Sequence, residues 1–298
     1  MVGARECRAQ RTSPLLAIAL DPPPSANIAA AVRVEPNSEI AIPDFPPGTE
    51  WVGGRELRLH RVLGRAIVLV EFFDIARVNS RRTLPYLRVW RDRYSDHHLQ
   101  LIGIHAPAYS FGRDAALVAR ACARLGIDWP VAHDPDFEIW RLYGNRGWPA
   151  RYLFDQRGQL RHLHFGEGEY QETELAIQEL VRETDPGAEL PPPLAPLRPE
   201  DAPGAVLEPQ TADIELPGDR ARLELEGEWR AGDDYLEAAS AGAVAHFRFR
   251  AGGAFAVLSG DREPDLYETD GEIVAERPGL RLHAIQFTPL PPRERSAG

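Results

Sequence analysis

The chain contains two cysteines, Cys7 and Cys122, and their positions argue against chemistry built on neighbouring thiols. They lie far apart, and neither belongs to a Cys-x-x-Cys pair or to a zinc-ligand spacing. Cys122 recurs in phase with Val118 and Leu125, on the stripe that an amphipathic helix buries. We therefore predict a structural thiol in the core, with a reactive Cys122 as the alternative.

The nine histidines are candidates for metal ligands. His162 and His164 share one face of a predicted strand, and His97 and His98 precede another, but no third ligand stands near either pair in sequence. Because zinc sites draw three or four ligands from short, recurring spacings, we predict no metal and no other cofactor. No serine-nucleophile elbow, phosphate-binding loop or paired glycosidase carboxylates stand out either.

Charge excludes further classes of protein. All 34 basic residues are arginines, so lysine-dependent nucleotide hydrolysis, protein kinase activity and Schiff-base chemistry are excluded. Residues 200–298 hold 10 arginines against 20 acidic residues. This half of the chain should repel the phosphates of nucleic acid, so we predict no nucleic-acid partner.

Targeting signals are weak. No apolar run approaches the roughly 18 residues of a membrane-spanning helix, so we predict no membrane span. Arginines precede the apolar run at 15–20, but this run is too short for the core of a signal peptide. We therefore expect a cytoplasmic protein whose residues 1–39 are disordered or wrongly assigned.

The elements that would position a site begin near residue 40, where strand and helix patterns start to alternate. The apolar run at 66–73, broken only by Glu71, is typical of a buried central strand. Alternation of this kind predicts a layered α/β domain over 40–184. Further strands are predicted at 99–105, 151–155 and 159–165, and helices around 84–94 and at 114–125 (capped by Asp114), 138–143 and 171–184.

The rest of the chain has a different composition. Residues 185–204 contain seven prolines in twenty positions, which predicts a semi-rigid linker. Short alternating strands with turn residues over 205–292 predict a small all-β sandwich-like domain, followed by a tail at 293–298. Asp270-Gly271 is a hairpin signal. Trp229 alternates in phase with Leu223 and Leu225, which favours a place in the core.

Seven short motifs follow one another between residues 40 and 183: IPDF at 42–45, VLVEFFD at 68–74, TLPYL at 83–87, GIH at 103–105, YGN at 143–145, WPA at 148–150 and HFGEG at 164–168. In this order they resemble the thioredoxin-like domain of the DipZ-type redox proteins, relatives of the redoxin and TlpA group. The resemblance implies a central mixed sheet flanked by helices. Residues 227–229 and 235–238 are similar, more weakly, to the carbohydrate-binding-module-like β domain of the same proteins.

Such domains carry a Cys-x-x-Cys at the start of the helix after the central strand. The free N–H groups and the helix dipole there stabilise a thiolate. The resemblance places this motif on residues 77–80, where Arg77 and Ser80 replace both cysteines. Dithiol exchange needs an attacking thiolate and a second sulfur, so the reaction of the family is unavailable at this motif.

Other site residues follow from the same resemblance. Glu71 matches a buried acid that serves as proton relay, and its pKa should be raised unless it is paired. We expect a leftover relay or a pairing with Arg77 or Ser80; the alternative is an acid that reaches solvent. Pro149, after Trp148, matches a cis-proline beside which an extended peptide would bind; the alternative is a folding turn without a ligand.

Arg77, followed by Arg81 and Arg82, places positive charge at a helix start, where an anion or an acidic peptide would compensate it. The alternative is a solvated arginine. We therefore predict a redox-inactive thioredoxin-like protein, not an enzyme, that binds a protein or extended peptide near Pro149 and an anion at Arg77.

Two alternatives stay open. One is a thiol-disulfide oxidoreductase or peroxidase-like enzyme that uses Cys122. The other is carbohydrate binding by residues 205–298, with Trp229, Tyr235 and Tyr267 as stacking platforms. The acidic charge of this region favours an arginine-rich protein surface over an anionic glycan, and the Arg77 side of the first domain qualifies. A second copy of the chain is another candidate for contact with this region.

Overall fold

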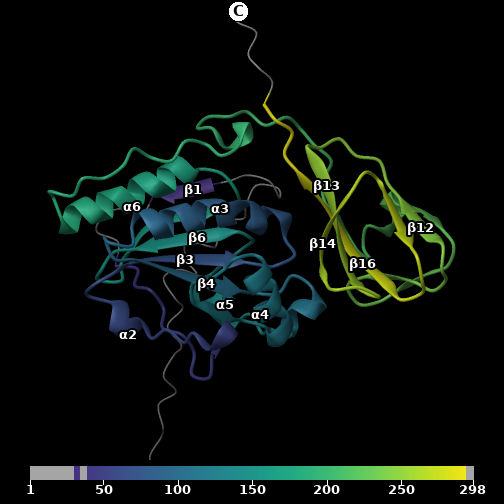
Figure 1. The fold of residues 1–298 in the computed structure, drawn as a ribbon, viewed down its shortest axis with the longest axis horizontal. Coiled ribbons are helices and arrows are strands. Elements are labelled where there is room, and N and C mark those ends of the chain that lie inside the picture. The colour runs from purple at the N-terminus through teal and green to yellow at the C-terminus, as the bar shows by residue number, and fades with distance from the viewer. Residues whose placement is uncertain (1–29, 34–38, 293–298) are drawn as a thin grey trace, which may run out of the picture.

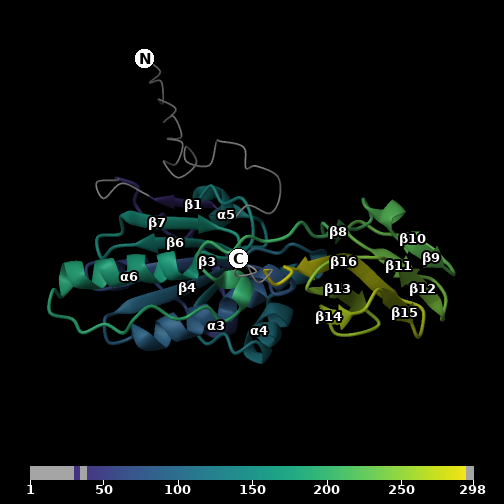
Figure 2. The same cartoon turned by 90° about the horizontal axis from the view of Figure 1, so that it is seen from above.

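The computed structural model describes residues 30–33 and 39–292, which form an α/β part and an all-β part (Figures 1 and 2). The α/β part has a seven-stranded sheet in the order β1-β7-β6-β3-β4-β5-β2. β3, β4 and β5 run parallel, and the other neighbouring pairs are antiparallel. The strands are β1 (Ala30–Arg33), β2 (Glu50–Trp51), β3 (Ile67–Phe73), β4 (Leu99–His105), β5 (Val131–His133), β6 (Ala150–Phe154) and β7 (Leu160–Phe165).

Helices cover both faces of this sheet. Successive residues of β3 point to opposite faces: Leu69 packs under α3 and α6, whereas Val70 packs under α2 and α5. Figure 1 shows α3 and α6 on one side of the strands and α2 and α5 on the other. The predicted thioredoxin-like α/β fold is confirmed. The helices are α2 (Leu59–Val62), α3 (Val78–Arg93), α4 (Ala115–Arg124), α5 (Glu138–Leu142) and α6 (Tyr170–Thr184).

Strand β1 corrects one expectation. It pairs antiparallel with β7, from Ala30 opposite Phe165 to Arg33 opposite His162, so the disorder predicted for residues 1–39 is wrong for these four residues. The ladder occupies the edge of β7, which would otherwise present unpaired backbone groups. Residues 1–29 with Cys7, residues 34–38 and the tail at 293–298 lie outside the described residues.

The proline-rich segment after α6 lies against the first domain instead of spanning open solvent. Leu190 and Leu194 pack on the core beneath α3 and α6. Further along, the Tyr86 hydroxyl donates to Asp201 at 2.8 Å and accepts the N–H of Leu197 at 2.8 Å. The segment is therefore anchored to α3 as far as the short helix η3 (Pro199–Asp201).

The all-β part consists of two antiparallel sheets that share one core. The larger sheet has the order β10-β11-β16-β13-β14, with β8 also paired to β16, and the smaller is β15-β12-β9. The strands are β8 (Ile214–Glu215), β9 (Glu224–Glu226), β10 (Trp229–Ala231), β11 (Leu236–Ala238), β12 (Ala243–His246), β13 (Gly253–Gly260), β14 (Asp265–Thr269), β15 (Glu272–Ala275) and β16 (Leu280–Thr288). None of the described helices, in either part, is long and apolar enough to cross a bilayer.

The hairpin predicted at Asp270-Gly271 is wrong. β14 pairs with β13 in the larger sheet, whereas β15 pairs with β12 in the smaller one. The turn therefore carries the chain from one sheet to the other. Gly271 is needed there because it has a φ of +118° and because a Cβ at this position would lie 2.9 Å from the carbonyl oxygen of Phe247.

Asp114 caps α4 as predicted, and this cap is testable. Its Oδ1 accepts the N–H groups of Ala116 at 2.8 Å and Leu117 at 3.1 Å. We expect Asp114→Ala to lower the free energy of unfolding in urea by about 1 kcal/mol, because two helix N–H groups lose their acceptor. Asp136→Ala removes only an exposed ion pair to Arg113 and should cost about 0.5 kcal/mol or less. Equal losses in the two variants would contradict the cap.

Candidate functional site

The positions predicted to replace the redox motif lie at the start of α3, directly after the central strand. Arg77 is the residue before the first helical residue, and it provides no side-chain cap. Ser80 lies in the first turn with 1% of its surface exposed, and its Oγ accepts the N–H of Asp74 at 3.2 Å. The serine hydroxyl thus takes part in a local backbone contact.

Arg77 meets a carboxylate from the all-β part of the same chain. Its Nη1 donates to Glu215 Oε1 at 2.6 Å. The guanidinium carbon lies 5.3 Å from the ring centre of Tyr109 and 5.4 Å from that of Trp148, within the range of cation–π attraction. The alternative of a solvated arginine is wrong, because the guanidinium lies within cation–π range of two rings and pairs with an acid.

The two neighbouring arginines also have acidic partners. Arg81 forms an ion pair with Asp265. Arg82 donates to Glu167 and to Glu200, each at 2.8 Å. The positive helix start is therefore compensated by carboxylates of this chain, and an external anion would have to compete with them.

The loop between β3 and α3 is held by a buried acid that sequence analysis missed. Asp74 accepts the N–H groups of Ala76 at 2.7 Å and Ala108 at 2.9 Å, and it lies 3.4 Å from His105 Nε2. Burial alone would raise the pKa of Asp74, but His105 and the two amides lower it overall. The only signal in the sequence is an acid placed directly after a buried strand.

Glu71 does not belong to this group. It is 1% exposed, and neither carboxylate oxygen has a hydrogen-bond partner among the described residues. The pairing predicted with Arg77 or Ser80 is wrong, since those side chains contact Glu215 and Asp74. The opposite charge that acts on Glu71 is that of Arg151, its partner in the β3–β6 ladder. Burial raises the pKa of Glu71 to about 8, and Arg151 offsets part of the shift.

Trp148 and Pro149 lie directly before β6, and the structure brings Trp148 next to Arg77. The peptide bond between Trp148 and Pro149 is cis, and Pro149 is buried. Trp148 Nε1 donates to the carbonyl of Ala106 at 2.9 Å, and its ring centre lies 4.6 Å from that of Trp140. Of the predicted site residues, Arg77 and Ser80 lie at the start of α3, and Trp148, which precedes Pro149, lies beside Arg77. Glu71 instead pairs with Arg151 in the β3–β6 ladder.

The alternatives receive little support from the geometry. Cys122 is 4% exposed, and burial raises the pKa of its thiol to about 12, so its nucleophilic thiolate is scarce at neutral pH.

Trp229 is 6% exposed and belongs to the core of the all-β part, as predicted. Arg281 covers the ring of Tyr235 at 4.6 Å. Within residues 30–33 and 39–292, no cluster of His, Cys, Asp and Glu could hold a metal.

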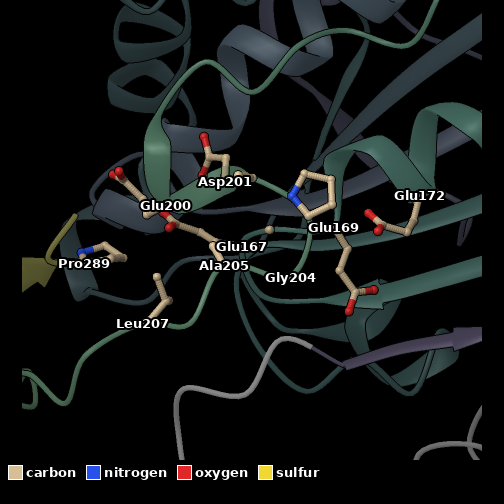
Figure 3. A pocket seen from close by; sticks show the side chains of 12 residues that line it. Glu167, Glu169, Glu172, Glu200, Asp201, Gly204, Ala205, Leu207 and Pro289 are labelled. Atoms are coloured by element: carbon tan, nitrogen blue, oxygen red, sulfur yellow. The ribbon is translucent and has the colours of Figure 1, made fainter. Parts of the chain in front are cut away.

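A separate acidic pocket lies between the loop before α6, the anchored linker and Pro289 (Figure 3). Its volume is about 300 Å³. Burial raises the pKa of Glu167 to about 7, although Arg82 opposes the shift. Arg82 of α3 pairs with Glu167 and Glu200 and so helps to hold these two pocket carboxylates in place. The carboxylates that line the pocket are Glu167, Glu169, Glu172, Glu200 and Asp201.

Glu71 offers a test of the buried charge. Because burial raises its pKa from 4.5 to about 8, the folded state holds an extra proton in this window, and stability falls as pH rises through it. Glu71→Gln cannot ionise. We expect it to match the original protein near pH 4 and to exceed its free energy of unfolding by on the order of 2–4 kcal/mol at pH 9. Parallel stability curves from pH 4 to 9 would show that Glu71 does not titrate in this range.

Comparison with known proteins places this geometry in context. No family model matches the chain. Protein DipZ of Mycobacterium bovis is 37% identical over 172 residues, which cover 57% of this chain but 25% of DipZ. Thiol-disulfide oxidoreductase YkuV of Bacillus subtilis is 26% identical over 144 residues, which cover 48% of this chain and 96% of YkuV. A solved thiol-disulfide isomerase from Corynebacterium glutamicum has a TM-score of 0.42 at 21% identity and covers 47% of this chain and 96% of its own.

The match therefore spans a quarter of DipZ and nearly all of YkuV. The chain contains a thioredoxin-like domain of the redoxin type that resembles part of DipZ, followed by an all-antiparallel β region.

Proposed function

We propose that the thioredoxin-like domain has lost dithiol exchange and acts by binding. The observation that carries this proposal is the start of α3, where Arg77 and Ser80 stand at the positions that the resemblance assigns to the two cysteines. YkuV is named a thiol-disulfide oxidoreductase, and that reaction needs an attacking thiolate and a second sulfur. Arginine and serine supply neither.

The cysteines of this chain do not replace the missing pair. Cys122 belongs to α4 and is buried among apolar side chains of the core. A thiol with a raised pKa carries little thiolate at neutral pH. Dithiol exchange also needs a second sulfur, and Cys122 has no disulfide partner among the described residues. These features disfavour the oxidoreductase and peroxidase-like alternatives.

Binding fits the groups that surround α3. Arginine forks suit carboxylates, since a guanidinium donates several hydrogen bonds in fixed geometry. The Arg77 guanidinium also lies near the rings of Tyr109 and Trp148. The ligand we propose is therefore a protein surface with acidic side chains, not nucleic acid.

Carbohydrate binding is not favoured, because Trp229 lies in the core. The cytoplasmic location stays a prediction.

Insulin reduction in the presence of dithiothreitol tests the loss of exchange. We expect the protein to precipitate insulin no faster than its Cys7→Ala/Cys122→Ala variant, because neither thiol takes part in exchange. YkuV serves as the active control. Turnover clearly above that of the double variant would overturn the proposal.

Thiol labelling tests the lone-nucleophile alternative. In the Cys7→Ala variant, we expect Cys122 to react with an aromatic disulfide reagent at least ~100-fold more slowly in the folded protein than in urea, since reaction requires local opening. The measurement is the absorbance of the released thiolate at pH 7. Rapid modification of the folded protein would favour an enzyme that uses Cys122.

A further inference from the structure

A side chain of the all-β part contacts the start of α3 as a bound ligand would. Gln286 of β16 is 1% exposed, and its Oε1 accepts the N–H of Val78 at 2.7 Å. Its Nε2 donates to the carbonyl of Ala76 at 3.0 Å and to the Tyr109 hydroxyl at 2.8 Å. The amide of one side chain thus forms hydrogen bonds to a backbone N–H, a backbone carbonyl and a side-chain hydroxyl of the first domain.

This contact uses the part of the helix that most needs a partner. Val78 is the first residue of α3, and the first N–H groups of a helix have no acceptor within it. Arg77 caps none of them with its side chain. The amide oxygen of Gln286 therefore supplies the acceptor that an incoming polypeptide would supply with a carbonyl or an amide.

Apolar groups seal the area around Gln286. Ala76 and Tyr109 of the first domain form one buried cluster with Val257 of β13 and Ala284 of β16. All four side chains are at most 4% exposed. Figures 1 and 2 show β13, β14 and β16 as the elements of the all-β part that lie toward α3 and α4. The hydrogen bond between Gln286 and Val78 is thus shielded from water.

In the ion pairs around this buried contact, the arginines belong to the first domain and the carboxylates belong to the all-β part. Arg77, Arg81 and Arg124 belong to the first domain, and they pair with Glu215 and Asp265 of the all-β part. In addition, the N–H and the hydroxyl of Ser110 donate to Asp234 at 2.6 and 3.0 Å. Every carboxylate in these contacts comes from residues 214–288. The donors and positive charges of the first domain thus complement the carboxylates and the glutamine of the all-β part.

We infer that the resident ligand of the α3 start is the chain's own all-β part, bound in cis, which closes this surface to other proteins. This inference rests on the proposed function, because it names the partner of the binding domain. Gln286 occupies the place of a ligand amide, and Glu215 and Asp265 supply the acidic groups. The peptide site predicted near Pro149 is then reached only after the two parts separate.

A reporter thiol at the interface tests the closure. In a Cys7→Ala/Cys122→Ala background, Ala76→Cys places a thiol in the contact with the all-β part, which acts as the cover. Leu175→Cys places a thiol on the exposed face of α6, where Leu175 is 46% exposed. We expect maleimide to label Ala76→Cys at least ~100-fold more slowly, because the reaction must wait for the parts to separate. Labelling at the rate of Leu175→Cys in the full chain would overturn the inference.

Second substitutions identify the contacts responsible. Gln286→Ala, or Arg81→Asp, should speed labelling of Ala76→Cys at least ~10-fold, and adding Asp265→Arg to Arg81→Asp should slow it again. Glu237→Ala is the matched control, because Glu237 pairs with Arg281 inside the all-β part; it should leave the rate unchanged. If charge reversal gives no rescue and Gln286→Ala has no effect, the inference fails.

Protein concentration separates cis from trans binding. Closure in cis predicts a labelling rate that is independent of protein concentration and a monomer in size-exclusion chromatography with light scattering. Protection that grows with concentration, together with a dimer, would assign the cover to a second copy and overturn binding in cis. Insulin turnover bears only on the proposed function, whereas labelling bears only on the cover, so the two can fail separately.

Discussion

The first N–H groups of α3 need an acceptor, and the arrangement around them follows from that need. The residue just before the helix is Arg77, whose charge has the wrong sign for this end of a helix dipole. The acceptor comes from Gln286, more than two hundred residues along the chain. Carboxylates of the all-β part then offset the arginines, so the packing of the two parts is centred on this helix start.

A second constraint lies inside the sheet. Glu71 and Arg151 face each other across β3 and β6, and both are fully buried. Arg151 donates to the carbonyl of Gly168 at 2.6 Å and lies 4.7 Å from the ring centre of Tyr170. A buried acid of this kind lowers stability unless it stays protonated. The residue matches the relay acid of the resemblance, but its neighbours in this fold are a ladder arginine and the α3–α6 layer.

Much of the first domain can be predicted from sequence, because its signals are local. The apolar run around Glu71, the strand that ends at His105 and the cap at Asp114 each depend on neighbouring residues, and each was placed within a residue or two. The turn at Asp270-Gly271 shows the limit of this approach. Its residues indicate a turn, but which strands pair on either side depends on contacts between the sheets.

The candidate site shows the same division. The resemblance predicts Arg77 and Ser80 at a helix start and Pro149, after Trp148, as a cis-proline, whereas no local pattern predicts the partners of Arg77. Gln286 lies in a strand that is almost entirely buried, so a polar residue in an otherwise apolar run was its only signal. Nothing local links it to Val78. Long-range polar contacts of this kind depend on how two folded surfaces meet.

The anchored linker sets how firmly the closed form resists competitors. Because the chain is held to α3 as far as Asp201 and Glu208 already pairs with Arg250 of the all-β part, the tether between the two parts is only the stretch 202–207. A tether this short keeps the all-β part at an effective concentration of about millimolar near the α3 start. An interface with modest intrinsic affinity therefore stays occupied. A free protein with the same acidic surface would need a comparable concentration, or a much tighter fit, to displace it.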